Sequence, residues 1–197
     1  MMNSWNGHLL TAVDVETTGT LAGWHEIIQI AAVPLDQHLD PLDNFFYINM
    51  QPEHPERISK EAERKHKIKL SDLEGCVTQE RGADLFEEWF KGLDLMFNKR
   101  LLPMAHNWGF ERSFLIHWLG EESFNEMWQG TPSDTIAVAR FINDLCIWHA
   151  RKHPFGYLNL GGLCDQFDIP LEDAHDALAD CIATAKLYRS FIQYLGG

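Results

Sequence analysis

The stretch LLTAVDVETTG, residues 9–19, decides the fold class and carries the first candidate site residues. Its apolar run predicts a buried strand over residues 9–15, which ends at the turn Thr17-Thr18-Gly19. Asp14 and Glu16 lie two residues apart, so both carboxylates project from the same face of the strand. Two adjacent carboxylates repel each other and usually need a cation such as Mg²⁺ or Mn²⁺. For this pair alone, solvated acids at the turn of an edge strand are the alternative.

Two further segments predict that this strand belongs to an antiparallel meander. Residues 26–35, EIIQIAAVPL, are rich in Ile, Ala and Val, and residues 44–50, NFFYINM, combine aromatic and β-branched side chains. Short connections, one of which contains Gly19 and Gly23, would join the three strands as hairpins. A fourth, short apolar strand is predicted at residues 101–105.

The rest of the chain predicts mostly helices. Residues 82–97 carry Phe86, Phe90 and Phe97, together with other apolar residues at helical spacing. Helices are predicted at residues 58–66, 82–97, 110–119, 134–148, 160–167 and 177–195. This order predicts the α/β class, with a mixed sheet flanked by helices, in a single domain over residues 1–197.

Composition narrows the class of protein. The 197 residues include 45% hydrophobic and 23% charged residues, which excludes a disordered or fibrous chain. No apolar run approaches the roughly 18 residues that span a membrane, and the first ten residues lack the features of a signal peptide. Four cysteines without a C-x-x-C pair indicate reduced thiols and a cytoplasmic location. The net charge of −13 argues against a nucleic-acid coat, which needs a broad basic face.

A second candidate motif, HNWGFERSF at residues 106–114, follows the fourth predicted strand and opens a helix. Glu111 lies in the first turn of this helix, where Phe110 and Phe114 occupy the buried face. Taken alone, this is an acid favoured by the helix dipole.

A third candidate motif, AHDALAD at residues 174–180, leads into the last predicted helix. His175 precedes the helix and Asp180 lies within it. Taken alone, His175 is a capping or surface residue, and Asp176 is a helix N-cap.

In this order, the three motifs resemble those of the DEDDh exonucleases, which include the polymerase proofreading subunit, ribonuclease T and oligoribonuclease. The resemblance runs from about Leu9 to Tyr188. It implies a ribonuclease H-like fold, a five-stranded mixed sheet flanked by helices. It also implies that His175 is the general base and that two Mg²⁺ or Mn²⁺ ions are bound by Asp14, Glu16, Glu111 and Asp180.

The resemblance implies hydrolysis from the 3′ end of single-stranded nucleic acid, with release of nucleoside 5′-monophosphates; DNA is favoured over RNA. Two departures stand out. Glu111 occupies the place of the family's Asp, which leaves open indirect metal binding, a preference for Mn²⁺ or reduced activity. Gln29 replaces an acid that is common in the second strand, and we interpret it as a structural change away from the motif acids.

Substrate contacts are also implied. Thr17, Thr18 and Gly19 would contact the 3′-terminal nucleotide, with Asn107 close by. Trp108 would stack an exposed ring on the terminal base, although most aromatic residues are expected in the core, and Trp24 is a weaker candidate.

Basic residues are concentrated in residues 57–69, which carry six Lys or Arg and two Glu, net +4, and in residues 149–153. Either segment contacts phosphates or is a solvated surface. The expected partners are single-stranded DNA or RNA 3′ ends and not a membrane, while a homodimer and association with a polymerase stay open.

Two other functions remain alternatives. The first is a low-activity or inactive nucleic-acid-binding or accessory module on an exonuclease scaffold, which only Glu111 supports. The second is a hydrolase of small nucleotides or dinucleotides that uses the same site. A comparison of rates on dinucleotides and long strands separates this second alternative from the exonuclease.

Overall fold

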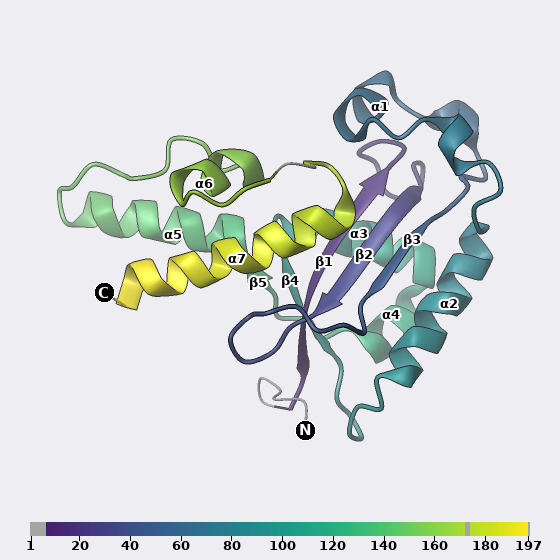
Figure 1. Cartoon of the computed structure of the whole chain (residues 1–197), viewed down its shortest axis with the longest axis horizontal. Coiled ribbons are helices and arrows are strands. Elements are labelled where there is room, and N and C mark those ends of the chain that lie inside the picture. The colour runs from purple at the N-terminus through teal and green to yellow at the C-terminus, as the bar shows by residue number, and fades with distance from the viewer. Residues whose placement is uncertain (1–6, 172–173, 197) are drawn as a thin grey trace.

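The computed structural model describes residues 7–171 and 174–196. Its centre is a five-stranded sheet in the order β3-β2-β1-β4-β5 (Figure 1). β1, β2 and β3 form the predicted antiparallel meander, and β4 and β5 run parallel to β1. The predicted mixed sheet is therefore confirmed. The strands span Leu9–Thr17 (β1), Ile27–Pro34 (β2), Phe46–Asn49 (β3), Leu101–Ala105 (β4) and Ser133–Asp134 (β5).

Helices cover both faces of this sheet (Figure 1). α7 crosses one face, over β1 and β2, while α2, α3 and α4 lie on the other. α5 and α6 pack beside α7, and α1 lies beyond the end of β1. The helices span Lys60–His66 (α1), Gln79–Gly92 (α2), Trp108–Leu119 (α3), Glu121–Met127 (α4), Thr135–Trp148 (α5), Leu160–Gln166 (α6) and Ala177–Gly196 (α7), with 3₁₀ turns at Pro55–Arg57 and Leu70–Leu73.

The two faces of the sheet are packed by different kinds of side chain. On the α2–α3–α4 face, Val13 and Val15 of β1 join an aromatic core that includes Phe86, Phe114 and Trp128. On the α7 face the buried cluster of described residues has no aromatic member, and half of it consists of small residues, Ala12, Ala31, Ala177, Cys181 and Ala185. Small side chains let α7 lie close to the sheet. Asp14 and Glu16 alternate with the two valines, so they project on the α7 side.

Two sequence predictions differ from the structure. The helix predicted at residues 82–97 begins earlier and ends earlier, because Thr78 caps it and the backbone turns at Asp94, with φ of 47°. Met96 and Phe97 are therefore outside α2, and they are 78% and 91% exposed. α4 and the two-residue β5 have too few residues to give a clear periodic signal, and neither was predicted.

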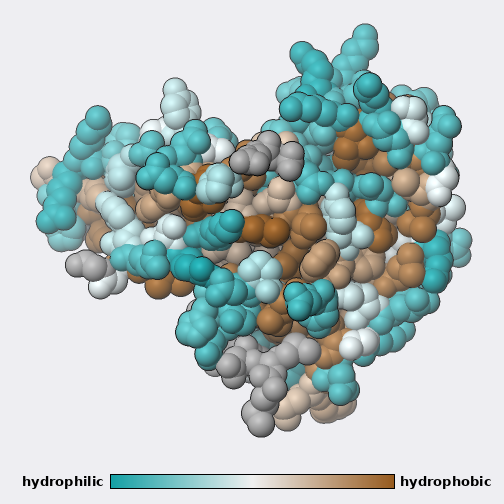
Figure 2. Space-filling view, in the orientation of Figure 1, coloured by the Kyte–Doolittle hydropathy of each residue, from teal (hydrophilic) through white to brown (hydrophobic). Residues whose placement is uncertain are grey.

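The surface is mostly hydrophilic around its edges, with hydrophobic side chains gathered over the middle of the face in view, beside α7 (Figure 2). Within residues 7–171 and 174–196, no helix is both long and apolar enough to cross a membrane.

Candidate active site

β1 is the central strand of the sheet, and the first two acids lie near its C-terminal end, where the chain turns. Glu16 is 6% exposed and Asp14 is partly buried. The register between β1 and β2 shifts between Glu16 and Thr17, so a bulge follows the second acid directly. The two carboxylates therefore lie on the α7 face at the point where regular pairing ends.

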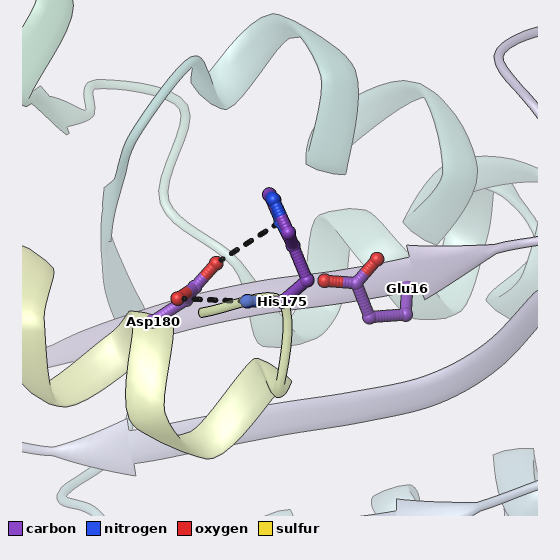
Figure 3. Close-up of side chains that lie close together, drawn as sticks. All are labelled: Glu16, His175 and Asp180. Carbon is purple, nitrogen blue, oxygen red and sulfur yellow. Dashed lines mark hydrogen bonds and ion pairs between the residues drawn. The ribbon is translucent and has the colours of Figure 1, made fainter. Parts of the chain in front are cut away.

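The start of α7 brings the third motif to these acids. A carboxylate oxygen of Glu16, one of Asp180 and a ring nitrogen of His175 lie within 4.8 Å of one another (Figure 3). The backbone N–H of His175 donates to Asp180 Oδ1 at 3.4 Å, and its Nδ1 lies 4.0 Å from Asp180 Oδ2. His175 has a φ of 72°, in the left-handed region, which turns its ring toward the strand acids while Asp180 stays in the helix.

A hydrogen-bond network fixes the start of α7 to the sheet. Asp176 accepts from the N–H groups of Leu178 and Ala179 and from the hydroxyl of Tyr47. Gln29 accepts from the N–H of Ala177 and donates to Tyr47. Gln29 is structural, as interpreted, but it does not lie away from the motif acids. The strand register places it directly opposite Glu16.

The second motif reaches the site from the other side of β1. Asp134, at the end of β5, accepts from the N–H of Trp108 at 2.8 Å and fixes the first turn of α3. Glu111 in that turn is 3% exposed. Its Oε2 is buried and has no hydrogen-bond partner among the residues that the structure describes. The fourth carboxylate is therefore present with one oxygen that no described protein group satisfies.

Burial makes it difficult for all four carboxylates to ionise together. Burial and the Asp180 charge raise the pKa of Asp14 well above its usual range. Burial and Asp14 raise the pKa of Glu16 to about 9 and also raise that of Glu111. Burial raises the pKa of Asp180 to about 6. A hard divalent cation fits this oxygen-rich site, because it would supply the missing positive charge.

The imidazole of His175 is suited to accept a proton. Burial lowers its pKa, and the positive charges of Lys65 and Lys67 lower it further. A pKa below the usual value near 6.5 keeps the ring neutral at pH 7.

Comparison with known proteins identifies this arrangement. Residues 11–188 match the model of the RNase_T exonuclease family. The chain belongs to the exonuclease family. The predicted enzyme class, a 3′–5′ exonuclease that hydrolyses phosphodiester bonds, is confirmed by this membership.

Individual relatives are similar over different shares of their length. Ribonuclease T of Yersinia enterocolitica is 26% identical over 205 residues, covering 98% of this chain and 90% of the relative. DNA polymerase III PolC-type of Listeria monocytogenes is 30% identical over 179 residues, covering 88% of this chain and 10% of the relative. E. coli Exonuclease I, solved with a dT13 oligonucleotide, has a TM-score of 0.71 at 16% identity, covering 96% of this chain and 43% of that one. The last likeness shows a shared ribonuclease H-like fold.

A cavity of about 780 Å³ in this exonuclease domain contains the three motifs, and we call it the carboxylate cavity. Of the predicted substrate contacts, Thr17, Gly19 and Asn107 line it. Thr18 does not: it is fully buried, and its Oγ1 accepts from the N–H of Glu26. The motif residues that line the cavity are Asp14, Glu16, Glu111, His175 and Asp180.

The prediction of an exposed Trp108 ring is wrong. The side chain is 4% exposed and packs against Phe124 and Trp128, because α4 covers this side of α3. Trp24 is 53% exposed, but it lines a neighbouring cavity of about 570 Å³, where the Arg57 guanidinium lies 4.1 Å from its ring centre.

Other residues of the carboxylate cavity were not assigned from the sequence. His66, His106 and Lys65 line it. His106 Nδ1 is 2.8 Å from Thr135 Oγ1, which links the second motif to α5. For Lys65 the sequence signal was the basic segment at residues 57–69. His66 lies in the segment at residues 58–68 that resembles the one after the family's third strand, but no role was assigned to it. The other basic segment, residues 149–153, is exposed and does not line the cavity.

Proposed function

We propose that this chain is a metal-dependent exonuclease that removes nucleotides from the 3′ end of single-stranded nucleic acid, with DNA favoured over RNA. The observation that carries the proposal is the convergence of four buried or partly buried carboxylates and one neutral imidazole in a single cavity. The products are nucleoside 5′-monophosphates.

In this proposal, Asp14, Glu16, Glu111 and Asp180 hold two divalent cations, Mg²⁺ or Mn²⁺. Such ions supply Lewis-acid stabilisation of the attacking and leaving oxygens in phosphoryl transfer. His175 takes the proton of the attacking water. Its Nδ1 faces Asp180, so Nε2 is the nitrogen that receives the proton.

The bound strand would end in the carboxylate cavity, beside Thr17, Gly19 and Asn107. A single-stranded substrate is supported by the E. coli Exonuclease I structures, which contain dT13 and dA16 oligonucleotides. The PolC-type relative supports action beside a polymerase. All four cysteines are unpaired, which supports a cytoplasmic location.

The test is release of nucleotides from labelled DNA and RNA strands that are blocked at one end or the other. We expect 5′-monophosphates from unblocked 3′ ends with Mg²⁺ or Mn²⁺, none with EDTA, and none from Asp14→Ala. If wild type releases no nucleotide from DNA or RNA with either metal, the proposal fails.

A low-activity accessory module is the second candidate function, because Glu111 is longer than the family's Asp and one of its oxygens lacks a partner among the described residues. This function predicts that Glu111→Asp creates activity in an inactive protein. A wild type that turns over, and loses turnover in Asp14→Ala, excludes it.

A further inference from the structure

Helix α1 lies beside the carboxylate cavity, and a backbone hydrogen bond fixes its N-terminal end there. The backbone N–H of Ser59, the N-cap residue, donates to the carbonyl of Thr18 at 2.8 Å. At the other end, His66 is 6% exposed, and its Nδ1 accepts from the N–H of Ile68 at 3.0 Å. The Ser59 contact ties the start of α1 to the turn that follows β1, and His66 of the last turn is buried and lines the carboxylate cavity. The side chains of that last turn therefore lie at the cavity.

α1 lines the cavity with Glu61, Ala62 and Lys65, of which Lys65 lies about one turn after the other two. Among the described residues that line this cavity, Lys65 is the only Lys or Arg. Five carboxylates surround it there. Among the described residues that line the cavity, Lys65 is therefore the basic side chain that a polyanionic strand would meet.

The ammonium of Lys65 lies near the acids without pairing with them. Its charge opposes the rise in pKa of all four motif carboxylates. No ion pair of 4.0 Å or less joins it to a carboxylate in the described part of the chain, and its side chain is exposed. Lys65 therefore lies at the mouth of the cavity, between the acids and the solvent. A compact ammonium on a flexible stem suits a phosphate oxygen.

We propose that Lys65 binds the strand phosphate next to the scissile one on its 5′ side. The inference rests on the proposed exonuclease function, in which the 3′-terminal nucleotide occupies the cavity. From there the strand can continue only in the 5′ direction, outward past the mouth. Lys65 would therefore favour a strand over a substrate that has a single phosphodiester.

The experiment compares dithymidine monophosphate, which has only the scissile phosphate, with a ten-residue oligothymidylate. Wild type, Lys65→Ala and Lys65→Arg are assayed with Mg²⁺ and Mn²⁺. Lys60→Ala is the matched control, because Lys60 is an exposed lysine of the same helix that does not line the cavity. Melting temperatures of all variants check that each is folded.

For Lys65→Ala, we expect KM for the ten-residue strand to rise about tenfold, with kcat changed less than about twofold. KM for the dinucleotide should stay unchanged. The dependence of log KM on log salt should become shallower by about 0.7, the value for one phosphate contact on a single strand. Lys65→Arg should restore most of the affinity, and Lys60→Ala should behave as wild type.

Equal losses on both substrates would overturn the inference, because Lys65 would then act on the scissile phosphate or on the acids. An unchanged KM for the strand, or an effect shared by Lys60→Ala, would overturn it too. In each of these cases wild type still releases nucleotides, so the proposed function stands. A wild type that cleaves neither substrate instead refutes the proposed function, together with this inference.

Discussion

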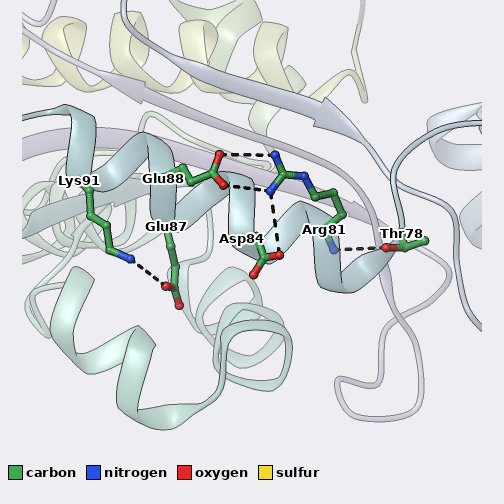
Figure 4. A network of polar contacts seen from close by, with 6 residues as sticks. All are labelled: Thr78, Arg81, Asp84, Glu87, Glu88 and Lys91. Carbon is green, nitrogen blue, oxygen red and sulfur yellow. Dashed lines mark hydrogen bonds and ion pairs between the residues drawn. The ribbon is translucent and has the colours of Figure 1, made fainter.

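Two groups of carboxylates in this protein have opposite electrostatics. On the exposed side of α2, Arg81 lies 2.9 Å from Glu88, and this hydrogen bond lowers the pKa of Glu88 (Figure 4). On the same helix, Lys91 lies 3.4 Å from Glu87. In the carboxylate cavity, burial and neighbouring acids instead raise the pKa of Glu16 to about 9 (Figure 3).

The difference lies in where the neutralising charge comes from. The chain places its own cations beside the acids of α2. Among the described residues that line the cavity, Lys65 is the only Lys or Arg, and it forms no ion pair with the acids there. Buried charges without partners destabilise a fold. We infer that the unpaired carboxylates of the cavity lower the stability of the metal-free protein, and that their function is to bind a cation. Removing a charge should therefore have opposite consequences in the two regions.

The largest effect is expected for Asp14→Asn. This change removes a cavity carboxylate while it keeps the volume of the side chain, and we expect activity to fall by about 10³-fold or more. The melting temperature of the metal-free protein should stay equal or rise, because one source of repulsion is lost. Steady-state rates and thermal unfolding in EDTA measure both. A fall in both quantities would mean that Asp14 is needed for folding, and the contrast with α2 would disappear.

His175→Gln is expected to have the next largest effect. Loss of the imidazole removes the proposed proton acceptor, and kcat should fall by roughly 10²- to 10³-fold. The metal concentration at half-maximal rate should change little, because the four carboxylates remain. Titration of Mn²⁺ against the residual rate checks this. A large rise in the metal requirement with normal kcat at saturation would instead make His175 a metal ligand.

The metal-free protein should lose stability as pH rises. The raised pKa values of the cavity acids mean that the folded state holds protons which the unfolded chain releases earlier. Their stabilising effect is therefore complete below about pH 4 and is lost as pH rises toward 9. We expect a fall in melting temperature of about 5 °C or more between pH 5 and pH 9 in EDTA. Mn²⁺ should reverse this fall, and Asp14→Asn should reduce it; equal slopes in all three samples would contradict the assignment.

The sequence was sufficient for β1 to β4 and for the order of the motifs. The apolar run of β1 and the alternation around Asp14 and Glu16 are local signals. The strand could therefore be predicted, and so could the shared face of the two carboxylates. The end of α2 could not, because Leu93 and Phe97 share helical spacing even though the backbone turns at Asp94. That turn depends on local backbone conformation rather than on the apolar pattern.

In the site, the wrong predictions concern residues whose surroundings are set by a segment that is distant in the sequence. Trp108 has an ordinary place in its motif, but Phe124 of α4 buries it. The place of Gln29 follows from the strand register and from Ala177, which is 148 residues away. The spacing of residues along the chain predicts neither the Trp108–Phe124 contact nor the Gln29–Ala177 hydrogen bond.

The smallest effect is expected on α2. Glu88→Gln removes an acid that is as much a carboxylate as Asp14, but an exposed ion pair contributes little and is screened by salt. We expect wild-type activity and a melting temperature lowered by about 1 °C or less, with no difference at 1 M NaCl. The slope of stability against pH in EDTA should match that of wild type, because Glu88 already has its cation in Arg81. Glu88→Gln could instead change the metal requirement or flatten that slope. The net charge of the protein would then explain the pH dependence and the metal requirement as well as burial of the cavity acids does.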